Sequence, residues 1–345
     1  MSPPALRRIA RTILPVAAML SLGWSLPSYA QGATAHASAT PRMRIVERQN
    51  LHEVTNGKPP AAGAVQVALR HDSLSSDVII KRAPSTPPAV EPLLNSARLN
   101  SEAVYVQELS SNTVLYEKSS SDIRPIASIS KLMMALIVLE SGLPMDEKLK
   151  ISDADVDRMR YSRSRLPVGS ELTRADMLHL ALMSSENRAA HALGRYHPGG
   201  MPAFVRAMND KARALGMRHT HFVEPTGLSA DNVSTARDLV KLVQATAQHP
   251  LIKSYSTNEK YDVSLSRGRQ LAYRNTNRLV RNDAWDIQVS KTGFINEAGE
   301  CLVMLTRIDG RDVAIILLNA SPQSRIADAI RIRSLVLKNT DLAML

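Results

Sequence analysis

The apolar and polar positions of the chain form a regular pattern from about Leu99 onward. The run EAVYVQEL alternates, is followed by the polar turn SSNT and resumes as VLYEK, which predicts a β-hairpin. From Ser128 to about His249 the apolar residues recur at helical spacing, and the later runs DIQVSK, CLVMLTR and DVAIILL predict three strands. The last two strands flank Asp309-Gly310, a strong hairpin turn, and SPQSRIADAIRIRSLVLK predicts a closing helix.

Three helices of the middle block carry end signals. LTRADMLHLALM has Thr173 as its predicted N-cap, with Asp176 in capping-box position. MPAFVRAMNDKARAL ends at Gly216, and STARDLVKLVQATAQ has Ser234 or Thr235 as its cap. The order of two strands, a helical block, three strands and a helix predicts an α+β fold with an inserted helical domain.

The first thirty residues have the composition of a secretory signal peptide. A basic start is followed by the uncharged apolar stretch Ile13–Leu26 and by the small-x-small sequence Ser28-Tyr29-Ala30, which predicts cleavage after Ala30. The alternative is an uncut anchor, but the stretch is shorter than the ~20 residues of a membrane span. Residues 31–98 are rich in proline, alanine and serine and predict a largely disordered linker. We therefore expect a mature protein without stable membrane insertion.

Charge and aromatic content argue against nucleic-acid binding. The formal net charge is +11, but the arginines are scattered and only 4% of the residues are aromatic, so no basic patch is interleaved with stacking residues. The charge suits solubility and a weak attraction to an acidic matrix.

Ser128 and Lys131 form the first candidate catalytic element. Their spacing places both side chains on one face at the start of a helix, and the residues after Lys131 are apolar all round, which predicts a buried helix. A serine hydroxyl is a weak nucleophile unless a base takes its proton, and a lysine serves as that base only if burial and nearby cations lower its pKa. The alternative is a capping serine beside a lysine that reaches solvent.

Two further short sequences add polar groups. Ser185-Glu186-Asn187 lies between two helical runs and predicts a tight turn, where the hydroxyl could pass a proton to a leaving amine and the amide could hold the lysine. Lys291-Thr292-Gly293 ends a predicted strand and offers a positive charge, a hydroxyl and an open strand edge for a substrate backbone. Taken singly, the first is also compatible with an ordinary helix cap and the second with a strand-end turn.

In combination, the three motifs resemble those of the low-molecular-mass penicillin-binding proteins. S-x-x-K, S-x-N and K-T-G occur in that order, 57 and 106 residues apart, and the likeness runs from about Leu99 to Lys338. The run SENRAA and the short C-terminus look most like the D-alanyl-D-alanine endopeptidase branch, since carboxypeptidases of the family usually add a β-rich domain and an anchor helix. The resemblance implies an antiparallel five-stranded sheet with flanking helices, an all-helical insert at about 128–250 and a peptidase domain over 99–338, followed by a tail at 339–345.

The resemblance also implies a role for each motif residue. Ser128 would be the acylated nucleophile and Lys131 its base. Ser185 would relay the proton to the leaving group, and Asn187 would position the substrate amide. The substrate would be bound by Lys291, Thr292, Gly293 and Phe294, with the backbone N–H groups of Ser128 and Phe294 as the oxyanion hole.

The implied function is a periplasmic serine-type D-alanyl-D-alanine endopeptidase that cleaves peptidoglycan cross-links. Its partners would be peptidoglycan stem peptides, with β-lactam antibiotics as covalent inhibitors, and no cofactor is needed because lysine and serines carry the proton transfers. Two positions depart from the family pattern. Ser130 replaces a frequent threonine, and Ile295 replaces a threonine whose hydroxyl lies near the carboxylate site.

Three alternatives stay open at this point: a carboxypeptidase, a β-lactamase and a catalytically inactive wall-binding module. A β-lactamase needs a carboxylate that activates water, and VEPTGL offers Glu224, although in the peptidases this run is a structural loop with its asparagine farther on, here Asn232. Cys301 lies in a strand-like run and predicts a buried residue. His219 and His221 form a pair without a third ligand, so we expect no metal site.

Overall fold

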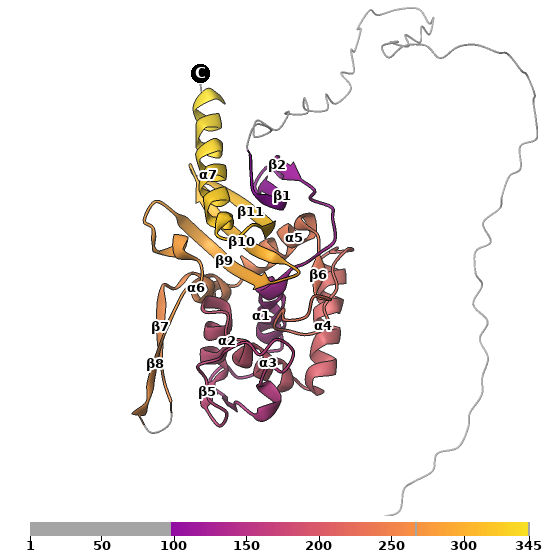
Figure 1. Ribbon diagram of the computed structural model, residues 1–345, viewed down its shortest axis with the longest axis vertical. Helices are drawn as coiled ribbons and strands as arrows, with labels where there is room; N and C mark the ends of the chain where they lie inside the picture. Colours follow the sequence, from indigo (N-terminus) through magenta and orange to yellow (C-terminus); the bar gives the residue numbers. More distant parts are fainter. Residues whose placement is uncertain (1–97, 266–267, 344–345) are drawn as a thin grey trace, which may run out of the picture. The chain divides into compact units, whose positions relative to one another are not determined.

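The computed structural model describes residues 98–265 and 268–343 (Figure 1). The expected signal peptide at 1–30, nearly all of the expected linker at 31–98 and the last two residues of the tail lie outside the described residues. Within the described residues, no helix has both the length and the apolar character needed to cross a membrane.

A five-stranded antiparallel sheet forms the centre of the fold and confirms the predicted α+β class. The strands follow the order β2-β1-β11-β10-β9, so the first hairpin joins the last three strands through the pairing of β1 with β11. Strand β9 lies at one edge of the sheet. The bounds are Ser101–Glu108 for β1, Val114–Lys118 for β2, Asp286–Ile295 for β9, Gly299–Ile308 for β10 and Arg311–Ala320 for β11.

The two faces of the sheet are covered by different helices because side chains alternate along each strand. Leu302, Ile315 and their alternate neighbours pack against helix α7 (Ser324–Ala343). Val303 and Ile316 are the next residues along the same strands, and they belong to the larger core that the sheet forms with the other helices. Asp328 fastens α7 to the sheet, since its buried carboxylate accepts hydrogen bonds from the Ser101 backbone N–H and hydroxyl, both at 2.7 Å.

Helix α1 (Ser130–Glu140) lies inside the larger core, as its uninterrupted apolar sequence predicts. Around it lie α2 (Arg174–Met183), α3 (Asn187–Arg195), α4 (Gly200–Ala214) and α5 (Ala236–Thr246). The predicted capping box of Thr173 and Asp176 is present, and Thr235 rather than Ser234 caps α5.

Several elements differ from the sequence-based expectations. The middle block contains short strands as well as helices. Strand β4 (Lys148–Lys150) pairs with β5 (Glu171–Thr173), and β6 (Val233–Ser234) pairs with β3 (Arg124–Pro125), which lies just before the block. Helix α6 (Pro250–Thr257) and the hairpin of β7 (Lys260–Ser264) and β8 (Gln270–Arg274) were not predicted. The described residues also form the 3₁₀ helices η1 (Ala127–Ile129), η2 (Asp153–Asp155) and η4 (Arg278–Arg281). Strand β9 does not end at the Lys291-Thr292-Gly293 sequence but continues to Ile295.

Candidate active site

Ser128 lies in η1, immediately before α1 and against the inner side of β9. Ala127, the residue before it, has a positive φ of 48°, an uncommon backbone conformation that turns the chain sharply at this point. A Cβ at Gly293 would lie 3.0 Å from the Ser128 backbone nitrogen and from the Ala127 Cβ. Glycine at this position therefore allows the strand to approach the turn that carries Ser128.

Lys131 is fully buried and makes three polar contacts. Its Nζ lies 3.0 Å from the Ser128 Oγ, 2.7 Å from the Asn187 Oδ1 and 2.6 Å from the Thr226 carbonyl oxygen. Burial lowers the pKa of Lys131 to about 8, while the charges of Glu224 and Glu186 act in the opposite direction. An amine with this pKa, within hydrogen-bond distance of a hydroxyl, is equipped to take the proton of that hydroxyl.

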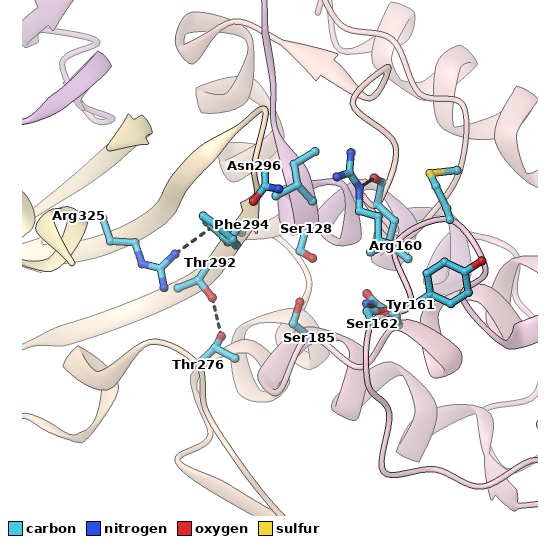
Figure 2. A pocket seen from close by; sticks show the side chains of 15 residues that line it. Ser128, Arg160, Tyr161, Ser162, Ser185, Thr276, Thr292, Phe294, Asn296 and Arg325 are labelled. Atoms are coloured by element: carbon cyan, nitrogen blue, oxygen red, sulfur yellow. Dashed lines mark hydrogen bonds between the residues drawn. The ribbon is translucent and has the colours of Figure 1, made fainter. Parts of the chain in front are cut away.

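The Ser185-Glu186-Asn187 turn connects α2 to α3 and lies across the cavity from β9 (Figure 2). Ser185 has a positive φ of 61°, as expected of a tight turn, and its side chain lines the cavity near Ser128. Asn187 holds Lys131 with its carbonyl oxygen and donates its Nδ2 to the Ser162 Oγ at 2.9 Å. The amide is thus oriented by partners on both sides.

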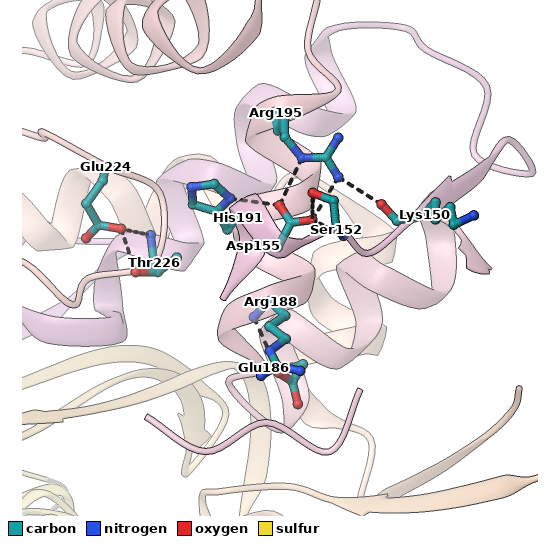
Figure 3. A network of polar contacts seen from close by, with 9 residues as sticks. All are labelled: Lys150, Ser152, Asp155, Glu186, Arg188, His191, Arg195, Glu224 and Thr226. Atoms are coloured by element: carbon teal, nitrogen blue, oxygen red, sulfur yellow. Dashed lines mark hydrogen bonds and ion pairs between the residues drawn. The ribbon is translucent and has the colours of Figure 1, made fainter. Parts of the chain in front are cut away.

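Asp155 anchors the segment that carries Ser162 to helix α3 (Figure 3). Its buried carboxylate accepts hydrogen bonds from Arg195 at 2.7 and 3.0 Å and is 2.8 Å from the His191 Nδ1. Burial alone would raise the pKa of Asp155, but the hydrogen bonds from His191 and Arg195 hold it well below its usual value. The carboxylate therefore stays charged and ties η2 to α3.

Lys291 is also buried and lies behind the cavity wall. Its Nζ donates to the Thr292 carbonyl oxygen at 2.8 Å. Burial and the nearby charges of Lys131 and Arg325 hold the pKa of Lys291 well below its usual value. Because the Lys291 amine does not line the cavity, it can influence a substrate only electrostatically, through the residues in front of it. The Thr292 hydroxyl does face the cavity and donates to the Thr276 Oγ at 2.6 Å.

A cavity of about 660 Å³ brings six of the eight predicted site residues together. Those six are Ser128, Ser185, Asn187, Thr292, Gly293 and Phe294, and the remaining two, Lys131 and Lys291, lie directly behind them. Phe294 is 59% exposed at the rim, and Ile295 is buried beside it. Ile295 therefore closes this part of the cavity wall with an apolar side chain and offers no hydroxyl there.

Sequence reasoning missed two arginines that line the same cavity. Arg325 of α7 donates to the Gly293 carbonyl oxygen at 2.9 Å (Figure 2). Arg160 contacts the Leu228 carbonyl oxygen and forms an ion pair with Glu297 at 2.8 Å. No local motif marks either residue, because each reaches the cavity only through the packing of distant segments.

The Glu224 carboxylate is occupied within its own loop and does not line this cavity. It accepts hydrogen bonds from the backbone N–H groups of Thr226 and Gly227, both at 2.6 Å. Asn232 is buried and donates to the Glu224 carbonyl oxygen at 2.8 Å. These contacts agree with the interpretation of VEPTGL as a structural loop rather than as a loop that activates water.

The remaining sequence candidates take no part in the site. Cys301 is fully buried in β10, and burial raises the pKa of its thiol to about 11. His219 and His221 are exposed, and no group of three or more potential metal ligands occurs among the described residues.

Comparisons with known proteins place the chain in one family. Residues 90–322 match peptidase S11, D-alanyl-D-alanine carboxypeptidase. A D-alanyl-D-alanine endopeptidase of Escherichia coli is 46% identical over 76% of this chain and 87% of that protein. Another, of Pseudomonas aeruginosa, is 48% identical over 72% and 81% of the two chains.

A solved structure shares the fold. The Streptomyces K15 DD-transpeptidase superposes with a TM-score of 0.65 at 27% identity, covering 69% of this chain and 97% of that one. Penicillin-binding protein D2 of Listeria monocytogenes, in its cefotaxime-bound form, gives a TM-score of 0.61 at 29% identity, covering 69% and 98%. The chain belongs to the peptidase S11 family.

Proposed function

We propose that the protein is a serine-type D-alanyl-D-alanine endopeptidase that hydrolyses peptidoglycan cross-links through an acyl-enzyme on Ser128. The observation that carries the proposal is the buried Lys131 amine, 3.0 Å from the Ser128 hydroxyl and fixed by two further acceptors. The endopeptidase assignment is supported by the names of the Escherichia coli and Pseudomonas aeruginosa relatives.

Acylation begins with the removal of the Ser128 proton. Neutral Lys131 accepts this proton while the Oγ attacks the carbonyl carbon of the D-alanyl residue. The charge that develops on the carbonyl oxygen is stabilised by the backbone N–H groups of Ser128 and Phe294, and each such donor is worth roughly 3 kcal/mol of barrier.

Collapse of the tetrahedral intermediate breaks the D-alanyl amide bond. The leaving nitrogen takes a proton through the Ser185 hydroxyl, which lines the cavity near Ser128 and receives a proton in turn from Lys131. Water then attacks the acyl-enzyme with Lys131 again as the base, which releases the D-alanyl carboxylate and restores the Ser128 hydroxyl.

The substrate lies along the open edge of β9. A substrate carboxylate next to the scissile bond binds to the Thr292 hydroxyl and the Arg325 guanidinium, both at the cavity surface. The buried Lys291 amine lies behind them, and its protonation changes the electrostatic potential at this carboxylate site. Arg325 supplies the carboxylate recognition that the hydroxyl missing at Ile295 would otherwise provide.

Carboxypeptidase activity is the second candidate, because the family match carries that description. Digestion of defined cross-linked dimers beside uncross-linked pentapeptide monomers separates the two activities. We expect faster cleavage of the dimers, slow covalent labelling by a fluorescent penicillin, and loss of both in Ser128→Ala. Preferential cleavage of the monomers would select the carboxypeptidase, rapid penicillin turnover a β-lactamase, and no reaction a wall-binding module.

We further propose that the protein acts in the periplasm after removal of residues 1–30. The basic, apolar and small-x-small segments of that stretch support this location. N-terminal sequencing of the exported protein is expected to begin at Gln31, and an uncut chain in the membrane fraction would reject the proposal.

A further inference from the structure

Glu224 organises the loop that follows α4 by accepting hydrogen bonds with both of its carboxylate oxygens. Oε2 accepts from the backbone N–H of Thr226 and Oε1 from that of Gly227, both at 2.6 Å. The Thr226 hydroxyl donates to the same carboxylate (Figure 3). The Ser229 N–H approaches Oε1 at 3.3 Å. A single acidic side chain thus fixes the backbone of residues 226–229.

This loop supplies one of the three acceptors of the Lys131 amine. The Thr226 carbonyl oxygen lies 2.6 Å from the Lys131 Nζ, the shortest of the three contacts. Peptide planarity links the direction of that carbonyl to the N–H of Gly227, which Glu224 holds. The position of the carboxylate therefore determines where the carbonyl points.

A second connection runs from Glu224 to the turn that carries Ser128. The Asn232 side chain contacts the Glu224 carbonyl oxygen at 2.8 Å and Oε1 at 3.2 Å, and it donates to the Ser130 Oγ at 2.9 Å. Ser130 donates in turn to the Ala127 carbonyl oxygen at 2.9 Å. Both members of the Ser128–Lys131 pair are thereby tied to the same loop.

We propose that Glu224 is a positioning residue for proton transfer: its carboxylate shapes the loop that orients the Lys131 amine, and its negative charge faces that amine. The proposal rests on the proposed acylation of Ser128. Glu224 does not reach the substrate cavity and acts only through Thr226, Asn232 and its charge.

The charge gives the proposal a distinctive signature. Glu224 from its loop and Glu186 from the turn before α3 both favour the protonated Lys131, whereas burial favours the neutral form. Lys291 of β9 is the cation that faces Lys131, and the charge of Lys131 lowers the pKa of Lys291. Removal of the Glu224 charge should therefore lower the pKa of Lys131 further and move the acid limb of the acylation rate to lower pH.

The test is the pH dependence of acylation by a fluorescent penicillin in wild type, Glu224→Gln and Glu224→Asp. Glu224→Gln presents an NH₂ group to backbone donors and carries no charge, so we expect the plateau rate to fall by about 10²-fold, the loss typical of ~1 Å misplacement, and the acid limb to move to lower pH. Glu224→Asp keeps the charge but is shorter, so the plateau should fall while the acid limb stays in place.

Asp231→Asn is the matched control, because Asp231 is an exposed carboxylate of the same loop whose partner is Ser229 rather than the catalytic groups. It should behave as wild type. Unchanged plateau and acid limb in Glu224→Gln, or a plateau loss without any pH shift, would reject the proposal. If Glu224→Gln fails to fold, a Glu224→Asp plateau within twofold of wild type would reject it. A wild-type chain that does not react at all would instead overturn the proposed function.

Discussion

Gly227 and Ala127 are in direct backbone contact: a Cβ at Gly227 would lie 1.9 Å from the Ala127 carbonyl oxygen. Gly227 follows the residue whose carbonyl binds Lys131, and Ala127 precedes Ser128. The close contact of these two small residues therefore helps to hold the base and the nucleophile in register, in addition to the hydrogen bonds that Asn232 and Ser130 make between the same two segments.

Gly227→Ala should abolish most acylation. The added methyl group forces the two backbones apart at a site where φ is +80°, and a shift of ~1 Å at the reacting groups costs about 10²-fold in rate. Gly142→Ala is the matched control, since Gly142 also has a positive φ of 66° but nothing within 4 Å of the added Cβ. The rates of penicillin labelling of Gly227→Ala and Gly142→Ala are compared with that of the wild type. Equal losses would mean that backbone strain, not the Ala127 contact, is responsible.

Lys131→Arg should be almost as damaging as removal of Ser128. Arginine keeps a positive charge at all accessible pH values, so it cannot take the serine proton, and loss of a general base typically costs about 10²- to 10⁴-fold. The acylation rate measures the effect, and thermal unfolding checks that the variant is folded. Substantial acylation by a folded Lys131→Arg protein would exclude Lys131 as the base.

The acylation rate should rise with pH through about 8. Lys131 has a pKa lowered to about 8, mainly by burial, and only its neutral form accepts the proton. Below that pH the neutral fraction, and with it the second-order acylation rate, should fall about tenfold per pH unit. Stopped-flow labelling at constant ionic strength tests this. An acylation rate that does not change between pH 6 and 8 would mean that Lys131, with its pKa of about 8, is not the group whose deprotonation controls the rate.

Asp328→Ala should destabilise the fold without changing the chemistry of the site. Its carboxylate is the acceptor for the buried Ser101 N–H and hydroxyl, and a buried donor left without a partner costs about 1–3 kcal/mol. Urea unfolding gives the free-energy change, and the acylation rate of the folded protein should match wild type. A stability equal to wild type would show that this contact contributes little.

Local sequence signals were sufficient for much of the fold. The capping box at Thr173 and Asp176, the Asp309-Gly310 turn and the apolar α1 are all encoded within a few residues, and all are present. The hairpin of β7 and β8 was not predicted, although KYDVS and QLAYR alternate over five residues each, the same length as the predicted strand VLYEK.

The site was predictable where a motif exists and not elsewhere. Ser128 and Lys131 meet through helical spacing, whereas Arg325 reaches the cavity from α7 and Arg160 from the segment after η2, and only tertiary packing brings them there. The strand boundary at Lys291-Thr292-Gly293 was wrong for a related reason: Gly293 pairs with Cys301, so the strand passes through the glycine.

Because Ser101 of β1 pairs with Ala320 of β11, the sheet joins strands made early and late during synthesis. The first hairpin is far from its partner along the chain, and pairing over such a distance folds slowly. β9, which faces Ser128, is also made late. A chain whose first hairpin has not yet paired with β11 thus lacks a finished sheet to support the substrate edge, so reactivity should appear only after the two ends of the domain have joined.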